Sequence, residues 1–263
     1  MVYNTFLFVL LGVAVTFLQG VAAQEYQERR DPEGARPAYT GKPVVARLIS
    51  GVHICTGLTN NEPCGQERWT VTVHSDGTRI LRSFLDQSIG GTQINLVLRV
   101  EQDFRPIDAF ASVYSRGKFL GSGFYAIEGD ALNVSVNAPG GYFTDKVALP
   151  ERYSLLLHPI AADGWHYGHY NKARGGAQMT SLCTLGAAGR SVHCAMYPIR
   201  LEFLGNETIT VPAGTFETEH YAFGQVTEVW IAGRDKIVIQ HEYKVRGSRH
   251  RLTVLEGDLQ LSR

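Results

Sequence analysis

Residues 68–74 read RWTVTVH, and in this stretch apolar and polar side chains alternate with a period of two. Trp69, Val71 and Val73 share one face of an extended chain, and the residues between them occupy the other face. Because successive side chains of a strand point to opposite faces of its sheet, this pattern predicts a strand with one buried face. The turn sequence SDGT follows at 75–78, and RILRSFL at 79–85 predicts the returning strand.

The same alternation continues along the chain. In QINLVLRVE, residues 93–101, every second residue from Ile94 to Val100 is apolar. Similar runs, with turn residues between them, follow at 111–115, 118–128, 131–137, 141–149, 197–205, 207–212, 217–224, 226–232, 236–245 and 249–255. About a dozen short strands, with no long stripe of 3.6-residue period, predict a mainly β protein. We expect an antiparallel curved sheet, arranged as a barrel, a half-barrel or a sandwich.

One segment departs from this pattern. Residues 150–194 are rich in Gly, His and Tyr, are too long for a tight turn, and include the sequence DGWHYGHY at 163–170. Long insertions in compact domains are usually functional loops or contain short helices. We therefore expect one long His/Tyr/Gly-rich loop, placed to cap the open end of a β cavity.

The N-terminus predicts export. The apolar run MVYNTFLFVLLGVAVTFLQGVAAQEY has no charged side chain until Glu25 and ends in the small residues Ala22 and Ala23. This pattern predicts a signal peptide at 1–23, with a membrane anchor as the alternative because the run approaches the roughly 20 residues of a spanning helix. Residues 24–43 are charged and rich in Pro and Gly, which predicts a flexible leader before a single antiparallel β domain at 44–263. We expect a periplasmic or secreted protein.

Charge and motifs exclude several classes of function. The chain has 25 basic and 25 acidic residues and no basic stripe, whereas nucleic-acid binding needs a concentrated positive field. It lacks the G-x-S-x-G elbow, H-E-x-x-H, the P-loop and a G-x-G-x-x-G that opens a helix. We therefore expect no nucleic-acid partner and no cofactor, and a neutral, hydrophobic or aromatic small ligand is the more natural partner.

Four cysteines form two local pairs, Cys55 with Cys64 and Cys183 with Cys194. In an exported protein an even number of cysteines favours disulfides, and each of these pairs would close a short loop. Free buried thiols and a four-cysteine zinc site are the alternatives, although the spacings are much longer than those of a zinc knuckle.

The C-terminal sequence GNETITVPAGTFETEHYAF, followed by VTEVWIA, KIVIQHEYKV and RLTVL, resembles an exported bacterial family of unknown function. Members of that family carry a V-P-A-G-x-F/Y element, here Val211 to Phe216, followed by a Tyr-containing strand and a Trp-containing strand, here with Tyr221 and Trp230. The resemblance covers about the last 60 residues. It implies a curved antiparallel sheet like that of periplasmic lipoprotein carriers, and it implies no catalytic residues. Pro212 and Gly214 also favour a tight hairpin turn on their own chemistry.

The first candidate site lies in DGWHYGHY and just before it. Asp163 with His166 can act in acid–base chemistry, because Asp can fix the tautomer of a histidine whose ordinary pKa is near neutrality. His166 and His169 with a carboxylate could instead form a facial metal site, but no helix is predicted to align them, and we expect no metal. A surface or structural loop is the third interpretation. The residues expected to line a pocket here are His158, Trp165 and Tyr167.

Two further groups of residues are candidates. In KIVIQHEYKV, His241 and Tyr243 fall in phase with Ile237 and Ile239, so they are expected on the apolar face, as acid–base residues or as a satisfied core pair. Tyr114 and Arg116 share a face, and Arg105 precedes Pro106 in the turn before them. An Arg–Tyr set inside a barrel can bind an anion, and an exposed strand edge explains these residues equally well. Trp230 is expected to line the ligand cavity.

The sequence therefore leads to three hypotheses. In the first, an exported protein binds a hydrophobic or aromatic small molecule in a β cavity. In the second, the same cavity belongs to a cofactor-independent lyase, isomerase or hydratase that uses His/Asp and Tyr/Arg groups. In the third, the sheet docks a partner in the cell envelope. Convergence of His158, His166, His241 and Asp163 on one cavity would favour the enzyme, and a purely aliphatic cavity would favour the carrier.

Overall fold

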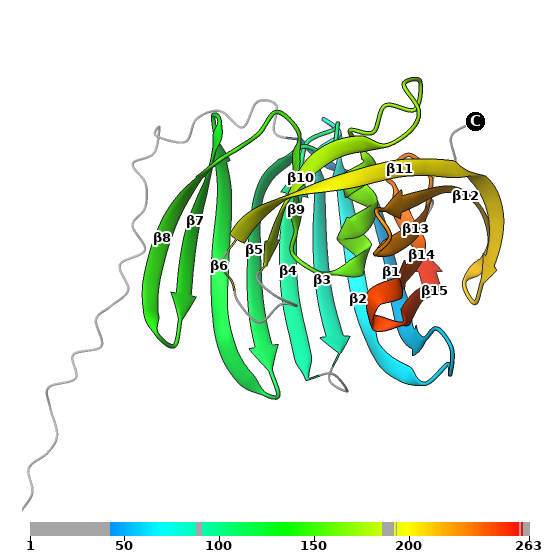
Figure 1. Cartoon of the computed structure of the whole chain (residues 1–263), viewed down its shortest axis with the longest axis horizontal. Coiled ribbons are helices and arrows are strands. Elements are labelled where there is room, and N and C mark those ends of the chain that lie inside the picture. Colours follow the sequence, from blue (N-terminus) through cyan, green and yellow to red (C-terminus); the bar gives the residue numbers. More distant parts are fainter. Residues whose placement is uncertain (1–42, 88–90, 186–191, 193, 258, 260–263) are drawn as a thin grey trace, which may run out of the picture. The chain divides into compact units, whose positions relative to one another are not determined.

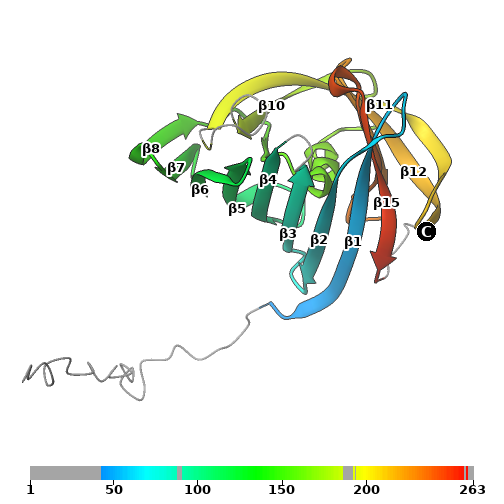
Figure 2. The same cartoon turned by 90° about the horizontal axis from the view of Figure 1, so that it is seen from below.

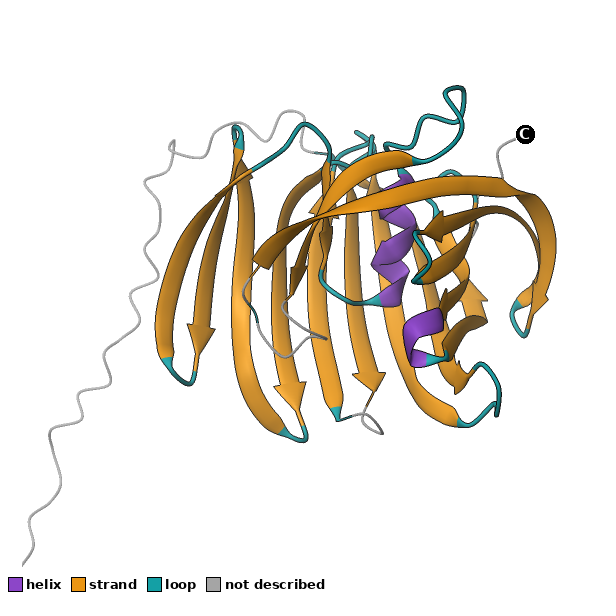
Figure 3. Ribbon diagram, in the orientation of Figure 1, coloured by secondary structure: helices purple, strands orange, loops and turns teal. Residues whose placement is uncertain are grey.

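Among the residues that the computed structural model describes, 43–87, 91–185, 192, 194–257 and 259, fifteen strands form one sheet. The pairing is antiparallel throughout except between β9 and β10. The predicted mainly β fold with a curved antiparallel sheet is therefore confirmed (Figure 3). The predicted signal peptide, and the predicted leader except for Pro43, lie outside the described residues.

The N-terminal half of the sheet is a simple meander in which each strand pairs with the next along the chain (Figure 1). Its strands carry the alternating sequences, and from β1 to β7 the apolar face of each is buried, whereas β8 is largely exposed. These strands are β1 (Val45–Gly57), β2 (Pro63–His74), β3 (Arg79–Gln87), β4 (Thr92–Val100), β5 (Pro106–Ser115), β6 (Lys118–Glu128), β7 (Ala131–Ala138) and β8 (Gly141–Ala148).

In the C-terminal half, the first strand is followed by a 3₁₀ helix, η1 (Ile160–Tyr167), and pairs in parallel with the next strand. The remaining strands form a second antiparallel meander, interrupted near its end by the short η2 (Lys244–Arg246). Among the described residues no helix has the length and hydropathy needed to cross a membrane. The strands are β9 (Tyr153–Leu156), β10 (Gln178–Leu185), β11 (Cys194–Val211), β12 (Gly214–Phe223), β13 (Thr227–Ala232), β14 (Ile237–Tyr243) and β15 (Ser248–Glu256).

The two meanders join where the first and last strands of the chain, β1 and β15, meet in the middle of the sheet. β1 pairs with β15, with Ser50 opposite Glu256 and Gly57 opposite Ser248. The sheet does not close, because β8 and β9 form its two free edges. Instead, β9 to β12 arch back across one face of the N-terminal strands (Figures 1 and 2). The sheet thus packs on itself, and a buried core lies between its two halves.

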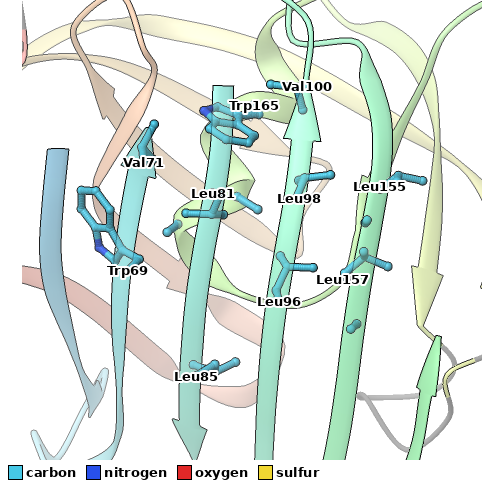
Figure 4. Close-up of a cluster of buried hydrophobic side chains, with 14 of the residues drawn as sticks. Trp69, Val71, Leu81, Leu85, Leu96, Leu98, Val100, Leu155, Leu157 and Trp165 are labelled. Carbon is cyan, nitrogen blue, oxygen red and sulfur yellow. The ribbon is translucent and has the colours of Figure 1, made fainter. Parts of the chain in front are cut away.

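The core contains the apolar faces of both halves. Leu155 and Leu157, at and just after β9, lie beside Leu96 and Leu98 of β4 (Figure 4). On the edge side, the Tyr125 hydroxyl of β6 donates to the carbonyl of Val192, 2.5 Å away. These contacts hold the C-terminal half over the N-terminal half.

The His/Tyr/Gly-rich segment 150–194 holds η1, together with the strands β9 and β10. Every residue of η1 is buried, so the helix lies inside the fold. Its first turn is fixed because the Ala161 N–H donates to both carboxylate oxygens of Glu67 on β2, each 3.1 Å away. Further along, the Trp165 indole N–H donates to the Asp235 carbonyl in the β13–β14 turn, at 3.0 Å.

That turn is itself tied to the N-terminal half. Asp235 is fully buried, and its carboxylate accepts from Arg79 of β3 at 2.9 Å and from Arg47 of β1 at 2.6 Å. A buried carboxylate needs such charged partners, since an unpaired buried charge is very costly. The guanidinium of Arg79 also stacks over Phe104, 4.4 Å from the ring centre. The turn that binds the Trp165 indole is therefore held by strands from both halves of the sheet.

Both predicted cysteine pairings are confirmed. Cys55–Cys64 links β1 to β2, and Cys183–Cys194 links β10 to β11. Disulfides persist in oxidising compartments, which supports an exported environment. The V-P-A-G element forms the predicted hairpin turn, because Val211 pairs with Gly214 and leaves Pro212 and Ala213 as the loop between β11 and β12.

The close packing of η1 against the β13–β14 turn yields a prediction about stability. A methyl group added at Gly164 would lie 2.0 Å from the backbone oxygen of Lys236, which cannot move without shifting the β13–β14 turn. We expect Gly164→Ala to lower the free energy of unfolding by about 1–3 kcal/mol or more, measured by urea denaturation. Gly140→Ala is the matched control, because its methyl group would contact only Phe143, 4.0 Å away, and it should change stability by less than about 0.5 kcal/mol. Equal effects of the two substitutions on stability would contradict the close packing of η1 against the β13–β14 turn.

Candidate functional site: a β cavity with an Asp–His cluster

A cavity of about 540 Å³ lies beside η1 and receives side chains from both halves of the sheet. Much of its wall is apolar, with Leu85 and Ile94 from the N-terminal half and Leu156, Leu182 and Val229 from the C-terminal half. The lining also includes the exposed residues Tyr197 and Arg246, so the cavity reaches the surface beside them. This apolar wall is formed by the inward faces of the alternating strands in both halves of the sheet.

The lining also contains polar side chains, and four of them form what we call the Asp–His cluster: Asp163, His166, His241 and His250. All four are buried. Asp163 and His166 come from η1, His241 from β14 and His250 from β15, where His241 and His250 are paired residues of adjacent strands. Among the described residues, no three His, Cys, Asp or Glu side chains are grouped in a way that would hold a metal ion.

Asp163 is the centre of the cluster. Its Oδ2 lies 3.0 Å from Nε2 of His241, and its Oδ1 lies 3.3 Å from Nε2 of His166. Burial alone would raise the pKa of this carboxyl, but His166 and His241 outweigh burial and hold the pKa well below its ordinary value. Asp163 is therefore an anion, and the Nε2 atom of His241 carries the proton that it donates.

His166 is fixed from its other side. Its Nδ1 lies 2.7 Å from the hydroxyl oxygen of Ser154 on β9, and Ser154 is itself buried. Ser154 does not line the cavity, so it holds the imidazole ring in place from behind. An imidazole with Asp163 on one nitrogen and Ser154 on the other has little freedom to turn.

His241 and His250 present unsatisfied nitrogens. Nδ1 of His241 and both ring nitrogens of His250 are buried and lack a hydrogen-bond partner among the described residues. Their rings lie edge to face, with centroids 5.8 Å apart. Buried polar groups are nearly always paired, so this set is an exception that calls for a partner. Because both residues line the cavity, the space where such a partner would lie is the cavity itself.

Electrostatics sets the charge of His250. Burial, followed by the nearby His241 and His53, lowers its pKa well below the ordinary value, and Asp163 opposes this shift only partly. His250 is therefore neutral at physiological pH, with one nitrogen that donates and one that accepts. Tyr167 also stays protonated, because burial and then Asp163 raise its pKa well above the ordinary value.

A second buried network lies behind the cluster. Glu67 accepts from the Ser83 hydroxyl at 2.6 Å as well as from the Ala161 N–H, and Nδ1 of His53 lies 3.7 Å from its other oxygen. Nε2 of His53 lies 2.8 Å from the carbonyl of Val238 on β14. These contacts link β1, β2 and β14 beneath η1 and position the strands that carry the cluster.

The structure brings together most of the predicted histidine and acidic residues. Asp163, His166, His241 and Tyr243 all line the cavity, as do His158 and Tyr167. His158 has a left-handed backbone with φ 73°, which is uncommon for a residue other than glycine. The convergence of these residues matches the geometry expected for an acid–base site, while their roles stay predictions.

Five predicted binding residues lie elsewhere. Trp165 is a core residue held by Asp235, and Trp230 stacks on His220, 4.1 Å between ring centroids, while its indole N–H donates to Glu207 at 2.6 Å. The residues of the proposed Arg–Tyr set are outside the cavity: Arg105, Tyr114 and Arg116. Arg105 is exposed and pairs with Asp103 in the turn before β5, and β5 itself is an inner strand between β4 and β6 rather than a sheet edge.

Sequence reasoning missed His250, Ser154 and Glu67. His250 had a usable signal, since it falls in phase with the buried Leu252 in RHRLTVL. Ser154 and Glu67 carried none, because each acts on a residue that is distant in the chain or belongs to another element.

The low pKa of His250 predicts how stability depends on pH. Between its folded pKa and the unfolded value near 6.5, the unfolded chain binds a proton that the folded protein does not, so stability falls as pH falls. From pH 7.5 to 5.5 we expect wild type to lose about 1 kcal/mol more stability than His250→Phe, measured by urea denaturation. Leu252→Val, in the same phase of β15, should destabilise the protein equally at both pH values. A wild-type pH slope that persists in His250→Phe would refute this assignment.

Comparison with known proteins gives no assignment of function. No family model and no curated protein matches the chain. It is similar to a solved β-barrel-like protein of a domain of unknown function, DUF1849, from Brucella abortus, with 11% identity, 81% of this chain and 97% of that chain covered, and a TM-score of 0.48. It is also similar to a DUF1089 family protein from Pseudomonas aeruginosa, with 12% identity, 72% and 93% covered, and a TM-score of 0.43.

Proposed function

We propose that this protein binds a small, mostly apolar molecule in the cavity beside η1. The observation that carries the proposal is the cavity itself, of about 540 Å³, with a largely apolar wall and one polar cluster. Pockets that hold small organic ligands have this size, this composition and a few convergent polar groups. A hydrophobic or aromatic compound would bury its apolar part against residues such as Leu85, Ile94 and Val229.

The unsatisfied polar atoms support the same proposal. A buried donor or acceptor without a partner costs about 1–3 kcal/mol, and three such nitrogens belong to His241 and His250. A ligand that pairs with them would recover part of this cost on binding. The cavity is therefore suited to a molecule with an apolar body and one polar end. Such a cavity favours a binding or carrier role. The two disulfides favour a location in the periplasm or outside the cell, where we also propose that the protein associates with the envelope.

An acid–base enzyme is the second candidate. Two observations favour it: His158, His166 and His241 converge with Asp163 on one cavity, and ionised Asp163 lies 3.0 Å from Nε2 of His241, in an arrangement suited to acid–base chemistry. Such a pair could move a proton in a cofactor-independent lyase, isomerase or hydratase. The two candidates differ in one observable, because only the enzyme would return a bound compound in chemically altered form.

Binding of a neutral fluorescent probe tests the proposed function. We expect N-phenyl-1-naphthylamine to bind wild type with a rise in fluorescence, because the probe is apolar and uncharged. Leu156→Trp places a larger side chain in the cavity, so it should weaken binding of the probe at least about tenfold, because less cavity volume remains for the probe. Val97→Trp is the control, since Val97 lies on the outer face of β4 and is 40% exposed.

Two results would overturn the proposal. One is a failure of wild type to bind the probe at all. The other is an equal loss of binding in Leu156→Trp and Val97→Trp, which would place the probe outside the cavity. Circular dichroism spectra of both variants would show whether each keeps the β fold.

A further inference from the structure

We infer that the ligand of this cavity carries a hydroxyl group, of an alcohol or a phenol, and that this group lies between His241 and His250. The inference rests on the proposed ligand-binding function and specifies the polar end of the molecule. Its basis is the set of ring nitrogens of His241 and His250 that lack a hydrogen-bond partner among the described residues.

The first atom is Nδ1 of His241. The other nitrogen of this ring, Nε2, donates to Oδ2 of Asp163 across 3.0 Å. The opposite nitrogen, Nδ1, is buried and has no hydrogen-bond partner among the described residues, and His241 lines the cavity.

The second group is the ring of His250. This ring is neutral, so it offers one N–H donor and one acceptor, and neither nitrogen has a partner among the described residues. It lies edge to face against His241 with 5.8 Å between centroids, close enough for one small group to contact both rings. A hydroxyl group matches this pair, because its O–H can donate to an acceptor nitrogen of one ring while its oxygen accepts from an N–H of the other.

Charged end groups match less well. Among the described residues that line the cavity, the only Lys or Arg is Arg246, which is exposed. A carboxylate placed at the two histidines would therefore lie beside ionised Asp163 with no fixed cation next to it. An ammonium group has three N–H donors and no acceptor, so it would leave the N–H of His250 unpaired.

Displacement of N-phenyl-1-naphthylamine at pH 8 tests this inference with matched pairs of compounds. The pairs are 4-nonylphenol with 4-nonylanisole, and 1-decanol with 1-methoxydecane. Within each pair the ether has a methyl group in place of the donor proton. We expect the hydroxyl member to displace the probe at about a tenfold lower concentration than its ether. Comparison of the two pairs shows whether the natural ligand is closer to a phenol or to an aliphatic alcohol. Decanoate and decylamine are expected to be weaker than 1-decanol.

Substitutions of single histidines test whether the preference for hydroxyl compounds over ethers arises at His241 and His250. In His241→Phe and in His250→Phe we expect the ratio between ether and hydroxyl compound to fall to about one, because the acceptor or the donor is gone. His220→Phe, a histidine that stacks on Trp230 outside the cavity, should keep the wild-type ratio. A variant that fails to fold leaves the other one and the wild-type series to decide.

The outcomes separate the two levels of the account. If wild type does not bind the probe, the ligand cavity and this inference both fail. If the probe binds but the ether and hydroxyl compounds displace it equally, or decanoate or decylamine displaces it best, only the hydroxyl inference is wrong. A preference that survives in both His241→Phe and His250→Phe would also overturn it.

Discussion

The fixing of η1 at two points inside the sheet is the constraint on which the rest of the structure depends. Glu67 holds the helix at Ala161, and the Asp235 carbonyl holds it at Trp165. Asp163 lies between these two points, so its position follows from two anchors on different halves of the sheet. Because Asp235 is itself held by Arg47 and Arg79, the helix also depends on how the two meanders pack together. The site is therefore a product of the whole fold rather than of one loop.

The same arrangement accounts for the polarity of the cavity. Burial would neutralise a lone carboxyl, yet Asp163 remains ionised because two imidazoles contact it. Its carboxylate in turn contacts both imidazoles, and Nδ1 of His241 is left without a hydrogen-bond partner among the described residues. His250 stays neutral for the opposite reason, since nothing compensates fully for its burial. One ion and one neutral ring, both buried, thus contribute polar groups to a pocket whose wall is apolar in large part.

Much of this fold could be predicted from the sequence, and part of the site could. The alternation in RWTVTVH and QINLVLRVE indicated the strands, V-P-A-G-T-F indicated its hairpin, and the cysteine spacing indicated both disulfides. The shared phase of His241 and Tyr243 correctly placed both on an inward face. A period-two pattern determines which face of a strand is buried, but not which strand or helix that face meets. The sequence therefore could not predict that β1 pairs with β15, that β9 returns over β4, or that Glu67 contacts η1. For the same reason Trp165, Trp230 and the Arg–Tyr set were expected in the cavity but lie elsewhere.

A crystal structure of the wild-type protein grown with 4-nonylphenol is the most direct test of the central claim. The account predicts density for the compound inside the cavity, with its phenolic oxygen within hydrogen-bond distance of Nδ1 of His241 and of a ring nitrogen of His250. It also predicts that Asp163 keeps its contacts with His166 and His241 when the compound is bound. A cavity that contains only water, or a compound bound on the outer face of the sheet, would contradict the account. So would a hydroxyl group that points away from the two histidines.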